Sequence, residues 1–268
     1  MKNKRQFGLI GKNIEYSFSR RFFLEKFNSN DKYLNFSYIN YDINSIEEVD
    51  NVFKQKNLCG LNVTIPYKEK IIKCLDEISD QAKEIGAVNT ICFENQRKIG
   101  YNTDIFGLSK SLEINEINNI DSVLILGSGG VAKTISYFCI NNNIPYNIVS
   151  RKQSNSYISY NSLNEKYFIN KVLIVNCTPV GTFPDIDLCP DLPYNLINKE
   201  NVIFDLVYNP SETLLMKKGK ERGKRKGPEG KKHRSRKRKK RAPCELLVQL
   251  ANSTSHEFSA HFVRTRLP

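Results

Sequence analysis

Residues 122–133 read S-V-L-I-L-G-S-G-G-V-A-K, and this stretch decides the fold. Ser122 to Leu126 is a short apolar run of the kind that parallel strands show when both of their faces are covered. Three glycines, Gly127, Gly129 and Gly130, follow at once, and apolar residues at helical spacing come after them. A strand, a glycine turn and a helix in this order predict a doubly wound, Rossmann-like domain.

The glycine turn is also a candidate cofactor site. Residues without a Cβ allow backbone N–H groups at a helix N-terminus to approach a pyrophosphate. A tight turn that binds no ligand fits the same pattern. The residues at the end of the next strand therefore help to distinguish a cofactor site from such a turn. It ends in Ser150-Arg151-Lys152, where NAD-binding units usually carry an acidic residue for the ribose hydroxyls. A cation suits a 2′-phosphate, so the sequence favours NADP over NAD, the alternative being that Arg151 is a solvated surface charge.

The formal net charge of +13 comes from one segment of the chain. Residues 217–241 contain 16 Lys or Arg side chains and two acidic ones, while the rest of the chain holds 25 basic and 26 acidic side chains. The charge outside this segment therefore does not indicate a polyanionic partner. From Gly219 to Arg241 no aliphatic or aromatic residue occurs. Such a stretch cannot bury apolar surface, so we predict a disordered polybasic insert over residues 217–243.

The placement of titratable residues narrows the chemistry further. All three histidines, His233, His256 and His261, lie near the C-terminal end. The main body therefore has no His-based triad, zinc site or histidine base, and we expect no metal. The seven scattered cysteines form no C-x-x-C pair and suit reduced thiols. No apolar run is long enough for a membrane helix, and we expect a cytoplasmic protein.

A length of 268 residues predicts two domains. Short strands and helices alternate before the glycine turn, and further strands follow it. The expected strands are 7–11, 34–41, 58–65, 87–93, 98–101, 122–126, 146–150, 172–176 and 202–208. The expected helices are 19–27, one that a capping box at Ser45 to Glu48 opens, 76–85, 104–112 and one after the glycine turn.

Several polar motifs stand at the ends of these elements. They are G-L-I-G at 8–11, S-F-S at 17–19, N-V-T-I-P-Y-K at 62–68, G-A-V-N-T at 86–90 and N-T-D at 102–104. Together they resemble the substrate domain of the shikimate dehydrogenase family. The second half continues the resemblance with G-S-G-G at 127–130, N-C-T-P-V-G at 176–181 and F-D-L-V-Y-N-P at 204–210. These motifs keep the order of the family from residue 7 to about residue 215.

The resemblance implies NADPH-dependent, reversible reduction of 3-dehydroshikimate to shikimate in aromatic amino-acid biosynthesis. Lys68 and Asp104 match the catalytic pair of the family. The positions that match substrate-binding groups are Ser17, Ser19, Thr64, Asn89, Asp104, Tyr208 and Gln249. Those that match the cofactor site are Gly127, Gly129, Gly130, Val131, Arg151 and Thr178, although the Asn-Arg-Thr of the family reads Ser150-Arg151-Lys152 here.

The chemistry of the residues agrees with these roles. A hydride that moves onto a ketone builds negative charge on the ketone oxygen, and the site must supply a proton or a strong hydrogen bond there. Lys68 can do this without metal or histidine. A nearby carboxylate favours the charged ammonium, while burial opposes it. Asp104 would therefore orient the ammonium and contact a substrate hydroxyl.

The C-terminal region departs from the family. When Leu246-Leu247-Val248 is laid on the family's Met-Leu-Val, Pro243 falls at an expected Gly and Leu250 at an expected Gln. Gln249 is the neighbour, about 100° away around a helix, and its role is open. Three interpretations of the insert compete: a solvated loop, a frame-shifted coding region, and a tether to nucleic acid or acidic membranes through non-specific phosphate binding.

We therefore expect a two-domain α/β protein. A mixed-sheet substrate-binding domain covers residues 1–103, completed by a helix at 244–258 if that helix docks, and an NADP-binding domain covers 104–216. The active site is expected in the cleft between them. One alternative is a quinate/shikimate dehydrogenase, against which Arg151 argues mildly. The other is a catalytically silent paralogue that binds a partner through its basic segment.

We expect the small-molecule substrate, shikimate or 3-dehydroshikimate, as the binding partner. We expect no association with a membrane. Nucleic acid would bind only non-specifically, through residues 217–241, whose basic side chains attract phosphates of any sequence. A homodimer is possible from the sequence. The sequence sets neither the oligomeric state nor the preference for shikimate over quinate.

Overall fold

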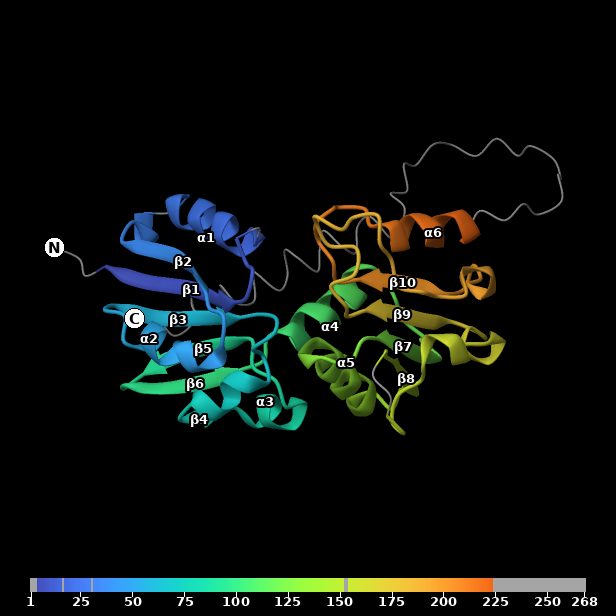
Figure 1. The fold of residues 1–268 in the computed structure, drawn as a ribbon, viewed down its shortest axis with the longest axis horizontal. Helices are drawn as coiled ribbons and strands as arrows, with labels where there is room; N and C mark the ends of the chain where they lie inside the picture. Colours follow the sequence, from blue (N-terminus) through green and yellow to red (C-terminus); the bar gives the residue numbers. More distant parts are fainter. Residues whose placement is uncertain (1–3, 16, 30, 152–153, 224–268) are drawn as a thin grey trace. The chain divides into compact units, whose positions relative to one another are not determined.

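The computed structural model describes residues 4–15, 17–29, 31–151 and 154–223. The described chain divides into two compact units, one ending at Gly107 and the other beginning at Leu108. Figure 1 shows that each unit is built around a β-sheet with helices on its faces. The division falls four residues beyond the expected boundary at residue 103, because the Asp104 side chain accepts hydrogen bonds from Lys68 and Asn89 of the first unit.

The first unit contains a six-stranded mixed sheet. Its strands in spatial order are β2 (Phe36–Asp42), β1 (Arg5–Gly11), β3 (Leu58–Val63), β5 (Thr90–Glu94), β6 (Arg97–Tyr101) and β4 (Glu77–Ile78). β1 is parallel to both of its neighbours, whereas β5 is antiparallel to β3 and to β6. The tight turn between β5 and β6 uses Asn95 and Gln96, both at positive φ, as a two-residue hairpin requires.

Helices cover both faces of this sheet, since the alternation of β1 sends apolar side chains to each side. Phe7 and Leu9 pack with α1 (Phe18–Asn28) in one cluster. Ile10 packs in a second cluster with α2 (Val49–Phe53) and α3 (Asp80–Ile85). β1 is therefore buried on both faces, and the polar residues that follow the strands lie at the sheet's edge.

Local signals set most helix ends. The Ser17 hydroxyl accepts a hydrogen bond from the N–H of Ser19 at the start of α1, and the Ser79 hydroxyl accepts one from Ala82 at the start of α3. These are standard N-caps. Gly86 ends α3 at φ 70°, a left-handed conformation that glycine adopts without strain.

Two sequence-based predictions in the first unit were wrong in detail. The helix expected from residue 76 begins only at Asp80, because Glu77 and Ile78 form a short strand that pairs with β6. The helix expected after Ser45 opens as a 3-10 turn, Ile46–Glu48, before α2 begins. In each case a short pairing or turn replaces the first turn of the predicted helix.

The second unit contains a four-stranded parallel sheet. Its strands in spatial order are β10 (Val202–Asp205), β9 (Val172–Asn176), β7 (Ser122–Leu126) and β8 (Tyr146–Val149). β7 is the first of these strands in the chain and lies at the centre. Its two neighbours are reached by connections that leave in opposite directions, which is the topological switch point of a doubly wound fold. The predicted α/β class with a Rossmann-like sheet is confirmed.

Both faces of β7 are buried, as its apolar run predicted. Val123 and Ile125 pack with α4 (Asp104–Ile114) and α5 (Gly130–Asn141). Leu124 and Leu126 pack on the other face with α6 (Leu214–Gly223) and short 3-10 turns. No helix among the described residues is both long enough and apolar enough to cross a bilayer.

The chain between β10 and α6 corrects two further expectations. β10 ends at Asp205 rather than at residue 208, because the Asp205 carboxylate accepts a hydrogen bond from the N–H of Val207 and turns the chain. Residues 217–223 belong to α6 and not to a disordered insert. The basic residues of this stretch are good helix formers, and Leu215 and Met216 anchor the helix in the core.

The remaining predictions for the C-terminal region, namely the insert from residue 224, the helix at 244–258 and Gln249, lie outside the described residues, as does Lys152.

We predict that Gly11→Ala destabilises the first unit. A Cβ at Gly11 would lie 2.4 Å from the Ile14 Cγ2 and 2.6 Å from the Thr64 Cγ2. Overpacking of this kind costs about 1–3 kcal/mol of unfolding free energy, to be measured by urea denaturation. In Gly129→Ala the added Cβ meets nothing within 4 Å, and this control should lose less than about 1 kcal/mol. Equal losses in the two variants would contradict the packing argument.

Candidate functional site

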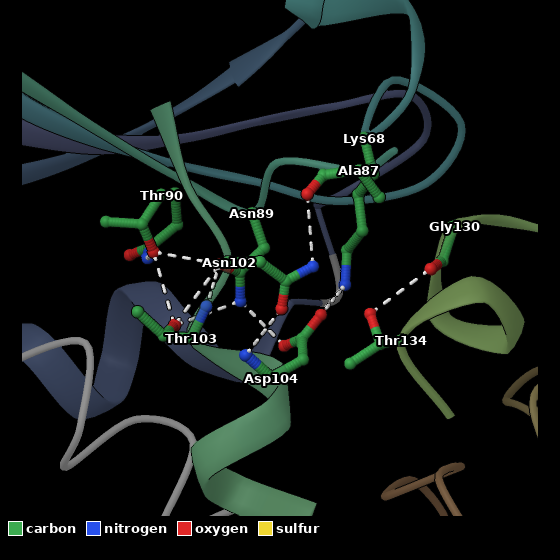
Figure 2. Close-up of polar contacts among 10 residues, drawn as sticks. Lys68, Ala87, Asn89, Thr90, Asn102, Thr103, Asp104, Gly130 and Thr134 are labelled. Carbon is green, nitrogen blue, oxygen red and sulfur yellow. Dashed lines mark hydrogen bonds and ion pairs between the residues drawn. The ribbon is translucent and has the colours of Figure 1, made fainter. Parts of the chain in front are cut away.

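An ion pair between Lys68 and Asp104 forms the centre of the site in the first unit. The Lys68 Nζ donates to the Asp104 Oδ2 at 2.7 Å, and the two side chains are 13% and 20% exposed. Figure 2 shows them pointing toward one another, Lys68 from the loop after β3 and Asp104 from the first residue of α4. The two residues are 36 positions apart in the sequence, and the fold brings their side chains together.

Asn89 connects this pair to the strand ends around it. Its Nδ2 donates to the Asp104 Oδ1 at 2.6 Å, so each carboxylate oxygen has a partner. The Asn89 Oδ1 accepts from the N–H of Thr103 at 2.8 Å, and the Thr103 hydroxyl also contacts this amide. Asn89 is 7% exposed and Thr103 4%. Because both oxygens of the Asp104 carboxylate accept a hydrogen bond, the carboxylate is held in one orientation.

The backbone of the same loops is also fixed. Asn102 donates through its Nδ2 to the Ala87 carbonyl at 3.1 Å and accepts at its Oδ1 from the N–H of Asp104, also at 3.1 Å. The Val88 N–H donates to the carbonyl of Lys68 at 2.8 Å. The G-A-V-N-T and N-T-D motifs are thereby tied to each other and to the lysine (Figure 2). The ammonium and the carboxylate meet because three loops share one hydrogen-bond network.

The polar network continues across the sheet to α1. Thr90 contacts the Thr103 hydroxyl at 3.3 Å and accepts from the Asn62 Nδ2 at 3.5 Å. The Asn62 Oδ1 accepts from the Tyr38 hydroxyl at 2.8 Å. Tyr38 is also hydrogen-bonded to Ser19, and its burial raises the pKa of its phenol well above the usual value, while the bond to Ser19 lowers it. The predicted residues Ser19 and Asp104 are thus linked by side chains alone.

The structure places the other predicted substrate residues as follows. Ser17 caps α1, and Thr64 lies directly after β3, where its carbonyl accepts from the N–H of Tyr67. Both belong to the first unit, with Ser19, Lys68, Asn89 and Asp104. Tyr208 lies in the second unit, half-buried in the segment after β10.

The glycine turn lies where β7 runs into α5. Gly127 has φ +106°, a conformation that L side chains rarely adopt, and a Cβ there would lie 3.0 Å from the Thr178 Cγ2. Gly129 and Gly130 begin the helix, and nothing lies within 4 Å of a Cβ built on Gly129. The N-terminus of α5 therefore offers free space beside backbone N–H groups, which an anionic group can use.

The other predicted cofactor residues surround this turn. Ser128 contacts Ser150 through their hydroxyls at 3.2 Å, which brings the end of β8 to the turn. Arg151 follows Ser150 and is exposed. Val131 is half-buried in the first turn of α5. The structure brings Gly127, Thr178 and Ser150 to the carboxyl edge of one sheet, the edge that binds ligands in doubly wound folds.

Sequence analysis missed several residues of the network. Asn62 and Asn102 lie within motifs that the sequence singles out, but the residues predicted from those motifs are Thr64, Lys68 and Asp104. Thr90 and Thr103 also lie within quoted motifs, which is a signal in the sequence, and the structure shows both of them buried. Tyr38 carries no such signal, because in an alternating strand it is indistinguishable from a core aromatic.

The fold and the two polar centres define a class of protein. A mixed-sheet unit with a lysine–aspartate pair, joined in sequence to a parallel sheet that runs into a glycine turn, is a two-domain α/β protein with a Rossmann-like unit. Residues 9–91 match the family model described as the shikimate dehydrogenase substrate binding domain.

Related proteins extend this match over most of the chain. The shikimate dehydrogenase (NADP(+)) of Methanococcus vannielii is 38% identical over 239 residues, which are 81% of this chain and 82% of that protein. The crystal structure of shikimate dehydrogenase 1 from Peptoclostridium difficile matches with a TM-score of 0.72 at 30% identity, covering 96% of this chain and 92% of that one. A shikimate dehydrogenase crystallised in complex with NADP+ matches with a TM-score of 0.69 at 26% identity, over 99% and 96% of the two chains. The chain belongs to the shikimate dehydrogenase family.

We predict that Tyr38 makes the protein sensitive to alkaline pH. The unfolded phenol ionises near its usual pKa of 10.0, whereas the buried one in the folded state has a raised pKa and stays protonated. The folded state therefore binds more protons above pH 10, and stability present below that pH is lost as pH rises. Between pH 10 and 11 the unfolding free energy of the wild type should fall by about 1 kcal/mol more than that of Tyr38→Phe. Urea denaturation between pH 10 and 11 measures this, and parallel slopes would contradict it.

Proposed function

We propose that this protein catalyses the reversible, NADPH-dependent reduction of 3-dehydroshikimate to shikimate, with Lys68 and Asp104 as its catalytic pair. The observation that carries the proposal is the 2.7 Å ion pair within a network of residues from three of the polar motifs of the first unit, those at 62–68, 86–90 and 102–104. Membership in the shikimate dehydrogenase family supports the reaction, and the names of the relatives support NADP as the cofactor.

Lys68 has the chemistry that the ketone oxygen requires. NADPH, when bound, supplies a hydride to the ketone carbon, and the negative charge that builds on the oxygen must be neutralised. An ammonium has three N–H donors, and one of those on Lys68 donates to Asp104. A second can donate to the ketone oxygen and transfer its proton as the alcohol forms. In the reverse direction the neutral amine accepts the proton from the hydroxyl.

Asp104 serves as the orienting group for this lysine. Its Oδ2 holds the ammonium and its Oδ1 is held by Asn89. A carboxylate has about four lone-pair sites, so Asp104 can also accept a hydrogen bond from a substrate hydroxyl. We propose that Asn89 and Thr64 bind ring hydroxyls and that Ser17, Ser19 and Tyr208 bind the carboxylate. The network through Tyr38 and Asn62 supports the proposed place of Ser19.

The residues of the second unit fit a dinucleotide. Gly127 and Gly129 leave the backbone open at the N-terminus of α5, where a pyrophosphate would be held. Val131 and Thr178 flank that position, and Arg151 follows the next strand, exposed and cationic, where it would pair with a 2′-phosphate. We also propose a cytoplasmic location, which the reduced state of the six described cysteines supports.

The assay that tests the reaction follows the absorbance of the reduced nicotinamide, NADPH or NADH, with shikimate or quinate as substrate and NADP+ or NAD+ as acceptor. We expect turnover with shikimate and NADP+ to exceed that with the other three combinations. A preference for quinate with NAD+ would indicate a quinate dehydrogenase, and no turnover with any combination would indicate a silent paralogue.

We predict that Lys68→Met lowers kcat by about 10²–10⁴-fold, the range that one proton-transfer group contributes. The variant should keep its affinity for NADPH, measured by fluorescence titration, because Lys68 lies in the other unit. Lys70→Met is the matched control, since Lys70 is an exposed lysine two residues away. A Lys68→Met variant with a rate near that of the wild type would remove Lys68 from the mechanism.

We predict that Arg151→Gln weakens NADPH binding about 10- to 100-fold, which corresponds to the loss of one charge-assisted hydrogen bond. Binding of NADH, which lacks the 2′-phosphate, should change little. Arg5→Gln removes an arginine from the first unit and controls for the change in net charge. Equal effects of Arg151→Gln on the binding of NADPH and NADH would show that Arg151 does not bind the 2′-phosphate.

A further inference from the structure

A buried polar connection joins the carboxyl ends of two neighbouring strands in the second unit. Asp205 ends β10 and Asn176 ends β9, and these side chains are 1% and 0% exposed. The Asp205 Oδ1 accepts from the Asn176 Nδ2 at 3.0 Å. The Asn176 Oδ1 accepts from the Thr178 hydroxyl at 2.7 Å and from its N–H at 3.1 Å. The position of Thr178 is therefore set by a carboxylate on the next strand.

Thr178 in turn packs against the glycine turn. Its Cγ2 lies 3.0 Å from the place that a Cβ would occupy on Gly127. The N–H of the preceding residue, Cys177, donates to the Leu126 carbonyl at 2.9 Å, which fixes this segment to the end of β7. The methyl group thereby borders the turn that we propose holds the pyrophosphate.

Asp205 is a buried carboxylate that the proposed proton chemistry does not use. Burial raises its pKa, while hydrogen bonds from Thr213, Val207 and Asn176 lower it. The Thr213 hydroxyl donates to the Oδ2 at 2.6 Å, and the Val207 N–H donates to the Oδ1 at 3.0 Å. A buried carboxylate is tolerated only when donors satisfy it in this way.

The Asp205 carboxylate, as an acceptor, also decides how the Asn176 amide points. With an acceptor oxygen at Asp205, the amide must turn its NH₂ toward that oxygen and its carbonyl toward Thr178. Without an acceptor there, the buried NH₂ loses its shorter hydrogen bond and keeps only the long one to the Val180 carbonyl at 3.5 Å, so the amide is less firmly held in this orientation. The orientation that holds Thr178 therefore depends on an oxygen at residue 205.

We propose that Asp205 is a positioning residue of the cofactor site, which through Asn176 holds Thr178 against the glycine turn in the geometry that binds NADP. The inference rests on the proposed function, because it assumes that the turn binds the dinucleotide. Asp205 acts through two other residues, and its effect is on cofactor affinity and not on the chemical step.

Three variants separate this role from a purely structural one. Asp205→Ala removes the acceptor, and we expect the Kd for NADPH, measured by fluorescence titration of folded protein, to rise about tenfold, equivalent to one lost hydrogen bond. Asp205→Asn keeps an oxygen that can accept from Asn176 and an NH₂ that can donate to Thr213, and it should restore the affinity to within about twofold. Thr213→Val removes the hydroxyl that donates to the Asp205 Oδ2. It should lower stability while leaving the Kd for NADPH unchanged.

A double-mutant cycle tests the path through Thr178. Thr178→Val keeps the methyl group and removes the hydroxyl that bonds to Asn176. If Asp205 acts through this residue, Asp205→Ala and Thr178→Val together should weaken NADPH binding by about the same factor as either alone, and not by the product of the two. If Asp205→Ala does not fold, Asn176→Ser takes its place with the same expected result.

Two outcomes overturn the inference, and they differ from the failure of the proposed function. Wild-type affinity in Asp205→Ala, or fully multiplicative effects in the cycle, would show that the carboxylate does not position Thr178. A wild-type protein that does not bind NADPH at all would overturn the proposed function and this inference with it.

Discussion

The ion pair between Lys68 and Asp104 is the interaction on which the first unit's polar architecture depends. Both groups are mostly removed from solvent, and charges in such surroundings persist only when each has a partner in good geometry. The surrounding loops supply that geometry. Asn89 holds the second carboxylate oxygen, and the carbonyl of Lys68 accepts from Val88. The pair is therefore held ready before any substrate arrives, so no free energy of binding is needed to assemble it.

The second unit also contains buried polar side chains that are paired with one another, but it uses different residues. Two of its four strands end in Asn176 and Asp205, which are buried and hydrogen-bonded to one another, and the bond from Thr178 to Asn176 holds the segment beside the glycine turn. Both units thus bury polar side chains at strand ends and pair them with one another. This arrangement gives each site a single geometry, because a half-satisfied buried network would cost more than an apolar core.

The agreement between sequence and structure differs from element to element. Ser122 to Leu126 is predicted to the residue, because an apolar run bounded by a polar residue and a glycine leaves no freedom in where the strand lies. The start of the helix at Asp80 was predicted four residues early, because the short pairing of Glu77 with β6 is a long-range contact that no local pattern announces. The helical stretch at 217–223 was predicted as disordered for a related reason. Its charged residues have no core of their own, and Leu215 and Met216 anchor the helix against the sheet.

The sequence by itself determined the α/β class, the glycine turn, the family and the identity of the lysine and aspartate, since each is written in local patterns or in motifs that keep their order. The tertiary structure alone decided which polar groups pair. Asn62 is linked to Tyr38, and Asn176 to Asp205, across strands that lie 24 and 29 residues apart in the chain. Hydrogen-bond partners of buried groups are set by strand register and sheet order, which arise only when distant segments pack. For that reason the hydrogen-bond partner of a residue such as Tyr38 or Asp205 is visible only in the folded protein.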